Sequence, residues 1–276
     1  MLVFSGRRKK KLKKLAKADV AIIGGTGLEA LLKDAEQIRV GTPYGLPPPI
    51  FLGQVNGKPV AFLPRHGLHH SVPPHKVNYR ANVFALYKIG VKQVVATNAI
   101  GAIKPDFEPG DLVVPHDLVD FTKLRQFTFY DDAPVTHVDM SELYCPTIRA
   151  LLIKTAREQG VQVWDRAVLV CTEGPRYETP AEIEMFRRLS CDIVGMTGAP
   201  EAMLARELEM CYATICFVSN MAAGMQQQLT ADEVAKVAEK KNPVIQQILR
   251  ETIKHLPSER HCLCAHALRA ARFEVK

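Results

Sequence analysis

The 276-residue sequence has no apolar run long enough to span a bilayer, and it lacks the hydrophobic region of a signal peptide. We therefore expect no membrane partner and a cytoplasmic protein. The seven cysteines are an odd number, and most lie in apolar segments, as Cys171, Cys211 and Cys216 do. This pattern favours reduced, buried thiols over the disulfide framework of a small secreted protein.

An excess of charge is also missing from most of the chain. The formal net charge is +7, but residues 7–17 alone carry eight Lys and Arg, and without them 28 basic residues remain against 29 acidic ones. The basic leader, residues 1–18, has two interpretations: an arm that binds nucleic acid, or a solvated extension. Because no basic patch continues into the rest of the chain, we expect no nucleic-acid partner.

Short apolar segments alternate with segments of helical periodicity from Asp19 onward. The predicted strands lie within 19–25, 59–67, 92–101, 167–175, 192–198 and 214–220, and the predicted helices within 78–90, 146–160, 180–189, 200–210 and 230–255. The alternation predicts an α/β fold, a single domain whose mixed central β-sheet is flanked by helices. We expect an antiparallel excursion around 105–140, and a last helix bent or broken at Pro243.

The domain boundaries follow from the same pattern. We assign residues 1–18 to the leader, 19–256 to the folded domain and 257–276 to a C-terminal tail. No segment within 19–256 has the composition of a linker, so a second domain is not expected.

The stretch AIIGGTGLEALL places Gly24, Gly25, Thr26 and Gly27 between a strand and a predicted helix. Glycines let the backbone approach an anion closely, and exposed N–H groups together with the Thr26 hydroxyl can hold phosphate. A tight turn is the other interpretation of these residues. The Rossmann glycine spacing and the P-loop lysine are both absent, so a nucleotide cofactor is not expected.

The stretch PRHGLHHSVPPH combines one arginine with several histidines, which are Arg65, His66, His69, His70 and His75. The arginine suits bidentate contact with phosphate. Clustered histidines can bind zinc, but no partner ligands stand at a matching spacing. We therefore expect no metal site.

Polar and aromatic side chains also follow three later strands: Tyr177 and Glu178, then Met196 and Thr197, and finally Asn220. A methionine there is most often simple packing, and an asparagine after a strand is most often part of a turn. However, α/β proteins bind their ligands at the carboxyl ends of strands. The shared position therefore favours one ligand site at this edge of the sheet.

Taken in order, the motifs AIIGGTG, RHG, VNYRAN, EGPRYET, GMTGAPEAMLAREL and the strand ending at Asn220 resemble the trimeric purine nucleoside phosphorylase and methylthioadenosine phosphorylase family. The resemblance covers residues 19 to 256, and the tail CLCAHAL resembles the Cys-x-Cys ending of some members. It implies a homotrimer, or a hexamer, with active sites near subunit interfaces. It also implies phosphorolysis: inorganic phosphate attacks C1′ of a purine nucleoside and releases the base, with no cofactor or metal.

The resemblance also implies roles for individual residues. Donors to phosphate would be Thr26, Arg65, His66, Asn98, Thr197 and the backbone at Ala99; family members often carry Thr or Ser in place of Asn98. The nucleoside would contact Tyr177, Glu178, Met196, Asn220 and His70. The catalytic residues would be Asn220, Glu178 and His66, since oriented donors and acceptors stabilise the charge that develops in the transition state.

The identity of the base depends on Asn220 and Glu178. Family members that cleave 6-aminopurines usually carry Asp at the position of Asn220, and a second carboxylate where this chain has Ala222. An asparagine cannot deliver a proton, but its amide can donate to O6 and accept from N7–H of a 6-oxopurine, while Glu178 accepts from N1–H. We therefore expect a preference for inosine, guanosine or methylthioinosine.

Two alternatives remain open on the sequence. One is a methylthioadenosine phosphorylase with an adenine preference; the small apolar residues Ala231 and Val234 lean toward a 5′-methylthio substituent. The other is a nucleoside-binding sensor without turnover. A sensor has no need of a full set of phosphate donors, which favours the enzyme.

Overall fold

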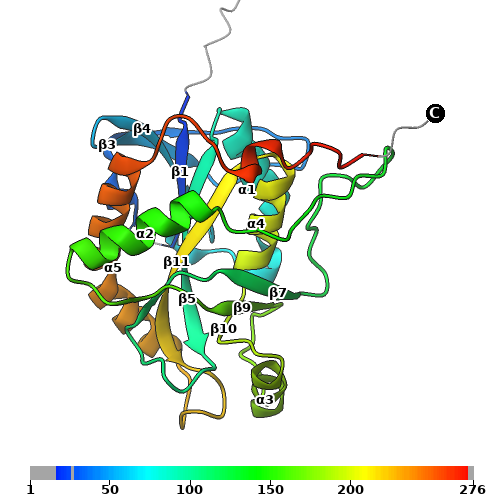
Figure 1. Cartoon of the computed structure of the whole chain (residues 1–276). Coiled ribbons are helices and arrows are strands. Elements are labelled where there is room, and N and C mark those ends of the chain that lie inside the picture. Colours follow the sequence, from blue (N-terminus) through cyan, green and yellow to red (C-terminus); the bar gives the residue numbers. More distant parts are fainter. Residues whose placement is uncertain (1–16, 26–27, 273–276) are drawn as a thin grey trace, which may run out of the picture.

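The computed structural model describes residues 17–25 and 28–272 (Figure 1). Its strands are β1 (Val20–Gly24), β2 (Lys33–Ile38), β3 (Ile50–Val55), β4 (Lys58–Pro64), β5 (Gln93–Ala102), β6 (Leu112–Val113), β7 (Asp117–Phe121), β8 (Val163–Trp164), β9 (Val168–Thr172), β10 (Ile193–Gly195) and β11 (Cys211–Met221). Its α-helices are α1 (Tyr79–Lys88), α2 (Pro146–Glu158), α3 (Pro180–Arg188), α4 (Gly198–Glu207) and α5 (Ala231–His255). Short 3₁₀ turns cover Leu28–Leu31, Leu68–His70, Pro74–Lys76 and Leu263–His266.

The strands form one mixed sheet in the order β2-β3-β4-β1-β5-β10-β9-β7, with β11, β6 and β8 branching from β5. Strand β1 pairs in parallel with β4 and β5, whereas β10 runs antiparallel to β5 and β6 antiparallel to β11. The predicted single α/β domain with a mixed sheet is confirmed. The antiparallel β6 also lies inside the segment 105–140 where the sequence predicted such an excursion.

Helices cover both faces of the sheet because its central strands carry apolar side chains on both sides. Val20 and Ile22 of β1 face a core shared with α2 and α5. The intervening Ala21 and Ile23 face the opposite core, shared with α1 and α4. The resulting three layers are visible in Figure 1, where α2 lies in front of the sheet.

Side-chain caps fix the starts of several helices. Asn78 accepts a hydrogen bond from the Ala81 N–H at the start of α1, and Thr230 caps α5 in the same way. Thr179 and Glu182 form a capping box at the start of α3, in which each side chain bonds the backbone of the other. The segment that precedes α3 is therefore held in a defined position.

Three local expectations were wrong. Strand β5 continues to Ala102, one residue beyond the expected strand, because Gly101 and Ala102 both stay paired to β10 and β11. A single 3₁₀ turn at Leu28–Leu31 replaces the helix expected after the glycines. Helix α5 is not broken at Pro243 but continues through it, since its apolar residues on both sides of the proline pack into the same core.

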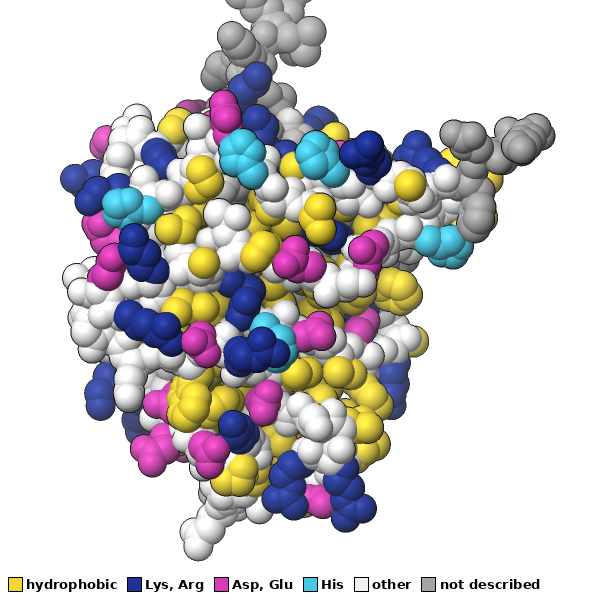
Figure 2. Space-filling view, in the orientation of Figure 1, with side chains coloured by type: hydrophobic (Ala, Val, Ile, Leu, Met, Phe, Trp, Pro, Cys, Tyr) yellow, Lys and Arg dark blue, Asp and Glu magenta, His cyan; other side chains and the backbone are white. Residues whose placement is uncertain are grey.

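The charge distribution agrees with the neutral balance of the sequence outside the leader. Figure 2 shows basic and acidic side chains interspersed over the face that it draws. Within the described residues, no helix is both long and apolar enough to cross a membrane. Residues 1–16 of the basic leader, and Thr26 of the glycine-rich stretch, lie outside the described residues.

We predict that Pro243→Ala stabilises the protein by about 2 kcal/mol. Pro243 is exposed in the interior of α5, where it removes a backbone hydrogen bond and crowds the carbonyl one turn earlier. The greater freedom of the unfolded alanine chain offsets roughly 0.4–1 kcal/mol of this gain. Denaturant unfolding measures the change.

The matched control is Lys240→Ala, at another exposed position of α5, which should change the free energy of unfolding by less than about 0.5 kcal/mol. A Pro243→Ala protein less stable than the wild type would contradict the prediction.

Candidate active site

A cavity of about 200 Å³ opens beside the ends of β4, β10 and β11 and the second half of β5. Its lining includes the sequence-predicted residues Arg65, His66, His70, Asn98, Ala99, Tyr177, Glu178, Met196, Thr197 and Asn220. The structure therefore brings together in one cavity residues spread over more than half of the chain. The remaining predicted residue, Thr26, lies outside the described residues.

Arg65 follows β4 and is buried, with 3% of its surface exposed. Its Nε donates to Oε1 of Glu201 at 2.5 Å and its Nη2 to Oε2 at 2.9 Å, while Nη1 donates to the Thr97 carbonyl at 2.9 Å. A guanidinium has five N–H groups, so two are left for a ligand. Burial alone would lower the pKa of Arg65, but the Glu201 carboxylate raises it overall, and the cation persists in the core.

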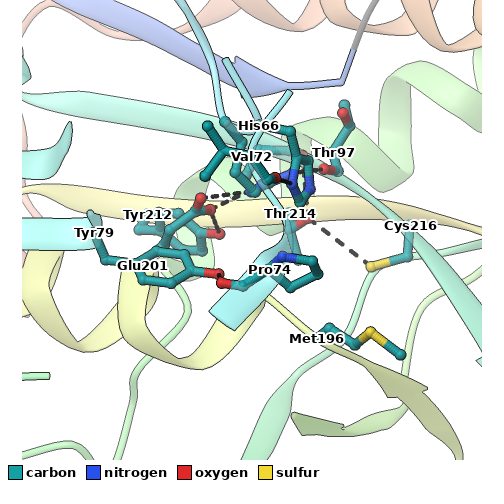
Figure 3. Close-up of polar contacts among 12 residues, drawn as sticks. His66, Val72, Pro74, Tyr79, Thr97, Met196, Glu201, Tyr212, Thr214 and Cys216 are labelled. Atoms are coloured by element: carbon teal, nitrogen blue, oxygen red, sulfur yellow. Dashed lines mark hydrogen bonds and ion pairs between the residues drawn. The ribbon is translucent and has the colours of Figure 1, made fainter. Parts of the chain in front are cut away.

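Glu201 is held in place from its other side as well. The Tyr212 hydroxyl, from β11, donates to its Oε2 at 2.9 Å (Figure 3). The Glu201 carboxylate accepts hydrogen bonds from both Arg65 and Tyr212, which keeps the arginine in one orientation. The sequence analysis did not identify Glu201. The signal was present: an acidic residue among the small apolar side chains of GAPEA at the start of α4.

The Nδ1 atom of His66 forms a hydrogen bond with the Val72 carbonyl oxygen at 2.8 Å (Figure 3). Because a carbonyl only accepts, Nδ1 carries the proton and Nε2 keeps its lone pair. Burial, and then the positive charge of Arg65, lower the pKa of His66 to about 4. The neutral ring, stacked on His70 with 4.4 Å between centroids, is therefore an acceptor at Nε2 and not the donor that the sequence analysis expected.

The start of α4 provides further donors at the same end of the cavity. Thr197 is the N-cap residue, yet its hydroxyl makes no capping bond, so it is available to a ligand. The first backbone N–H groups of a helix and its dipole favour an anion. Gly198 allows the close packing here, since a Cβ at this position would lie 2.9 Å from Leu169 Cδ2 and 3.3 Å from Asn98 Nδ2.

Asn98 and Ala99 come from the middle of β5. Ala99 is the one exposed position of that strand, which places its backbone at the cavity wall. The side-chain oxygen of Asn98 is buried and has no hydrogen-bond partner among the described residues. Since that oxygen can only accept, the amide NH₂ is the part of Asn98 that can donate to phosphate, and the oxygen suits a hydroxyl.

Asn220 is placed by a β-bulge near the end of β11. Val218 pairs with Ile100 and Asn220 with Gly101, so Ser219 is an extra residue that redirects the strand. The sequence analysis ended the strand at Asn220; the structure continues it through Met221. The glycine at 101 leaves room for the amide, because a Cβ there would lie 3.2 Å from Asn220 Nδ2.

The amide of Asn220 has a fixed orientation. Its Nδ2 donates to the Met221 carbonyl at 2.9 Å, and its Oδ1 accepts from the Ser219 hydroxyl at 2.6 Å. A carbonyl cannot donate, so the NH₂ group must face Met221. One N–H and one lone pair of the amide remain free for a ligand.

Tyr177 and Glu178 lie in the segment between β9 and α3. The Thr172 hydroxyl donates to Glu178 Oε1 at 2.6 Å, and the second carboxylate oxygen has no hydrogen bond of this kind in the described structure. Tyr177 is 38% exposed and lines the cavity. The segment therefore presents an aromatic face and a carboxylate next to each other.

Arg125 supports this wall of the cavity from outside. Its Nη2 donates to the backbone carbonyls of Glu173 at 2.6 Å and Met196 at 3.1 Å, and its Nε donates to the Glu173 carboxylate at 2.8 Å. One side chain thus joins the segments after β9 and β10. Arg125 was not predicted as a functional residue, because it lies in an irregular stretch with no motif.

The cavity therefore has two chemically different ends. Arg65, Thr197 and the start of α4 offer donors and positive potential, which suits a small anion. Asn220 and Glu178 offer one donor and two acceptors beside Tyr177, which suits a flat heterocycle with polar edges.

Comparison with known proteins gives matches over nearly the whole domain. Residues 19–254 match the family model described as the phosphorylase superfamily. The chain is 52% identical to the "Probable S-methyl-5'-thioinosine phosphorylase" of Methanothermobacter thermautotrophicus, over 91% of this chain and 89% of that protein. It is 48% identical to the 6-oxopurine nucleoside phosphorylase of Pyrococcus furiosus, over 91% and 98%.

A solved structure is similar as well. A methylthioadenosine phosphorylase from an Antarctic soil metagenomic library superposes with a TM-score of 0.89 at 37% identity, covering 94% of this chain and 93% of that one. This similarity extends over all of the layers described above.

We predict that Glu201→Gln destabilises the protein by roughly 3–5 kcal/mol, because it leaves the Arg65 cation buried without its counter-ion. The same substitution at Glu184, whose ion pairs with Arg187 and Arg188 are at the surface, should cost less than about 1 kcal/mol. Urea unfolding of the two variants measures the difference. Equal losses of unfolding free energy in the two variants would show that the buried ion pair contributes no more to stability than the surface pairs do.

We also predict that His66 titrates near pH 4 in the folded protein. Since its pKa is lowered from 6.5, the unfolded chain binds more protons between these values. This contribution to stability is therefore complete above pH 6.5 and is lost as the pH falls toward 4. NMR titration of the ring, assigned by its absence in His66→Gln, measures the midpoint. A midpoint near 6.5 would rule the interpretation out.

Proposed function

The chain belongs to the phosphorylase superfamily, and from this we propose that it catalyses the phosphorolysis of purine nucleosides. Inorganic phosphate attacks C1′ of the sugar as the bond to the base breaks, giving the free base and ribose 1-phosphate or 5-methylthioribose 1-phosphate. One observation carries the proposal: a single cavity joins an anion-binding end to an end suited to a heterocycle. The reaction needs no cofactor.

Phosphate binds at the end formed by Arg65, Thr197 and the start of α4. The two free N–H groups of Arg65, the Thr197 hydroxyl and the Asn98 amide hold its oxygens and orient one of them toward C1′. His66 accepts, through Nε2, a hydrogen bond from the single P–O–H group of the monohydrogen phosphate dianion. The bound dianion also balances the positive charge that develops on the sugar.

The base binds between Asn220 and Glu178, with Tyr177 against its face and Met196 under the ribose. A departing 6-oxopurine spreads its negative charge onto O6 and N7. N7 takes up a proton from water as the bond to C1′ breaks, and the phosphate group returns its proton to water once the ester has formed. The free N–H of Asn220 donates to O6, and its free lone pair accepts from the new N7–H. Glu178 accepts from N1–H. Adenine has an acceptor at N1, so it would face the carboxylate with no hydrogen between them.

Three apolar residues, Pro74, Leu229 and Val234, also line the cavity. We assign them to the 5′ side of the sugar. An apolar wall suits a methylthio group better than a hydroxyl, because a buried hydroxyl needs a hydrogen-bond partner. This supports methylthioinosine as a substrate beside inosine and guanosine.

The test is a panel of inosine, guanosine, adenosine, methylthioinosine and methylthioadenosine, each with and without phosphate. We expect phosphate-dependent release of hypoxanthine and guanine, with kcat/KM exceeding that for the adenine nucleosides by factors of up to about 10⁴. A higher kcat/KM for methylthioadenosine would favour the adenine-specific alternative. Binding without any turnover would favour a nucleoside sensor.

We predict that Asn220→Asp combined with Glu178→Gln shifts the ratio of kcat/KM toward 6-aminopurines. A protonated aspartate can donate to N7 of adenine, and the neutral amide at 178 can donate to N1. Asn56→Asp, at the exposed turn between β3 and β4 and outside the cavity lining, is the matched control and should leave the ratio unchanged. An unchanged ratio in the double variant would refute the assignment of the base-binding end.

We further propose a homotrimer, or a multiple of one, in the cytoplasm. Four apolar side chains of one segment are exposed: Phe121, Leu124, Phe127 and Val135. The same segment borders a surface hollow of about 720 Å³. Exposed apolar groups concentrated in one segment are typical of a contact between subunits.

Light scattering should give about three times the chain mass of 30.7 kDa, or a multiple of that. Leu124→Asp should lower the mass at a given concentration, whereas Leu46→Asp, at an exposed leucine elsewhere, should not. A fully active wild-type monomer would contradict the proposal.

A further inference from the structure

Four cysteines converge at a place far from the cavity. The sulfur atoms of Cys145, Cys211, Cys262 and Cys264 all lie within 4.8 Å of one another. The Cys262 sulfur is 3.8 Å from that of Cys145 and 3.3 Å from that of Cys211. Cys262 therefore has two sulfur neighbours, and the four thiols form a compact group with no obvious division into two pairs.

The spacing suits a tetrahedral metal ion. Zinc bound by four thiolates has Zn–S distances of about 2.3 Å, which puts the sulfurs about 3.8 Å apart. One of the two sulfur–sulfur distances given above equals this value and the other is about half an ångström shorter. Small side-chain rotations are enough to bring all four sulfurs onto one ion.

The backbone around the thiols is rigid and comes from three separate parts of the chain. Cys145 is the N-cap residue of α2, which places its sulfur beside the first backbone N–H groups of that helix. Cys211 is the first residue of β11, and its own N–H donates to the Lys92 carbonyl at 2.9 Å. Backbone N–H groups at a helix start favour the thiolate form that a metal requires.

Cys262 and Cys264 lie in the segment after α5, around the turn Leu263–His266. Three of the four cysteines are buried and Cys262 is half-buried. Arg260, two residues before Cys262, donates to the Glu209 carbonyl at 2.5 Å, next to the start of β11. A cation is thus close in the chain to a group that would carry a net negative charge around zinc.

We propose that Cys145, Cys211, Cys262 and Cys264 bind one Zn²⁺ in a closed structural site that fastens the C-terminal segment to the starts of α2 and β11. Each thiol gives its proton to solvent when it binds the metal. Four protein ligands leave no open coordination position, so the ion is structural. It is also remote from the cavity: Cys211 and Asn220 are at opposite ends of β11, about 30 Å apart at the rise of a strand.

This site departs from the sequence analysis, which expected reduced thiols and no metal. The four ligands are Cys145, Cys211, Cys262 and Cys264. They form no pair of Cys-x-x-Cys motifs that would indicate a zinc site in the sequence. Only the fold brings the three segments together.

The experiment is to produce the full chain in zinc-supplemented medium, wash it with EDTA and measure metal by mass spectrometry. We expect one zinc per chain. Cys262→Ser and Cys264→Ser should each lower the zinc content at least tenfold, and Cys191→Ser, at a buried cysteine outside the group, should retain it. Cobalt(II) in place of zinc should give the intense visible absorption of a tetrahedral tetrathiolate.

A second measurement uses only the wild-type protein, in case the serine variants do not fold. Alkylation of the four thiols should be slow in the zinc-loaded protein and should speed up at least tenfold after a strong chelator removes the ion. The melting temperature should fall on removal, while kcat/KM at 25 °C stays within twofold. Wild-type protein without zinc, zinc retained in both serine variants, or the four cysteines recovered as disulfides would each overturn the proposal.

Discussion

The parallel pairing of β5 with β11 is the constraint on which the site is built. It begins where Gln93 faces Cys211 and continues to Ala102 and Met221. Both strands are buried on both faces except at Ala99 and, in part, at Met221, so their register cannot slip without moving the side chains of the two cores. The extra residue at Ser219 changes the register once, and it does so at the cavity. The pairing therefore fixes the position of Asn98 relative to Asn220, and the bulge fixes the direction in which Asn220 points.

The charges of Arg65 and Glu201 determine the chemistry of one end of the cavity. A buried arginine is tolerated because Glu201 neutralises it and Tyr212 holds Glu201. The ion pair keeps the Arg65 cation in the core, and because the charges of Arg65 and Glu201 cancel, little net charge is buried when no anion is bound. The same cation helps to keep the nearby His66 uncharged. Donors and acceptors at this end are therefore set before any ligand arrives, and little reorganisation is needed on binding.

The alternation of strands and helices was predictable because each apolar run and each cap acts locally. The strand-end motifs at Arg65, Tyr177 and Thr197 were predictable for the same reason. The bulge at Ser219 was not, since it depends on how β5 pairs with β11. Glu201 could have been suspected as a lone carboxylate in an apolar helix start, but its partner could only be identified once the fold brought Glu201 of α4 next to Arg65, which follows β4. Arg125 had no signal at all, because its role is to join two segments that are distant in the sequence.

The hydrogen bonds of Arg125 to Glu173 and Met196 have a consequence for local unfolding. Arg125 belongs to a stretch between β7 and α2 that has no helix or strand of its own, and such stretches open more readily than the core. When Arg125 leaves, the carbonyls that it binds in the segments after β9 and β10 lose their common partner. Opening of an irregular surface segment and loosening of the cavity wall are thus one cooperative event. The fraction of molecules with an ordered cavity is limited by the free energy of that local opening, and not by the much larger free energy of unfolding the sheet.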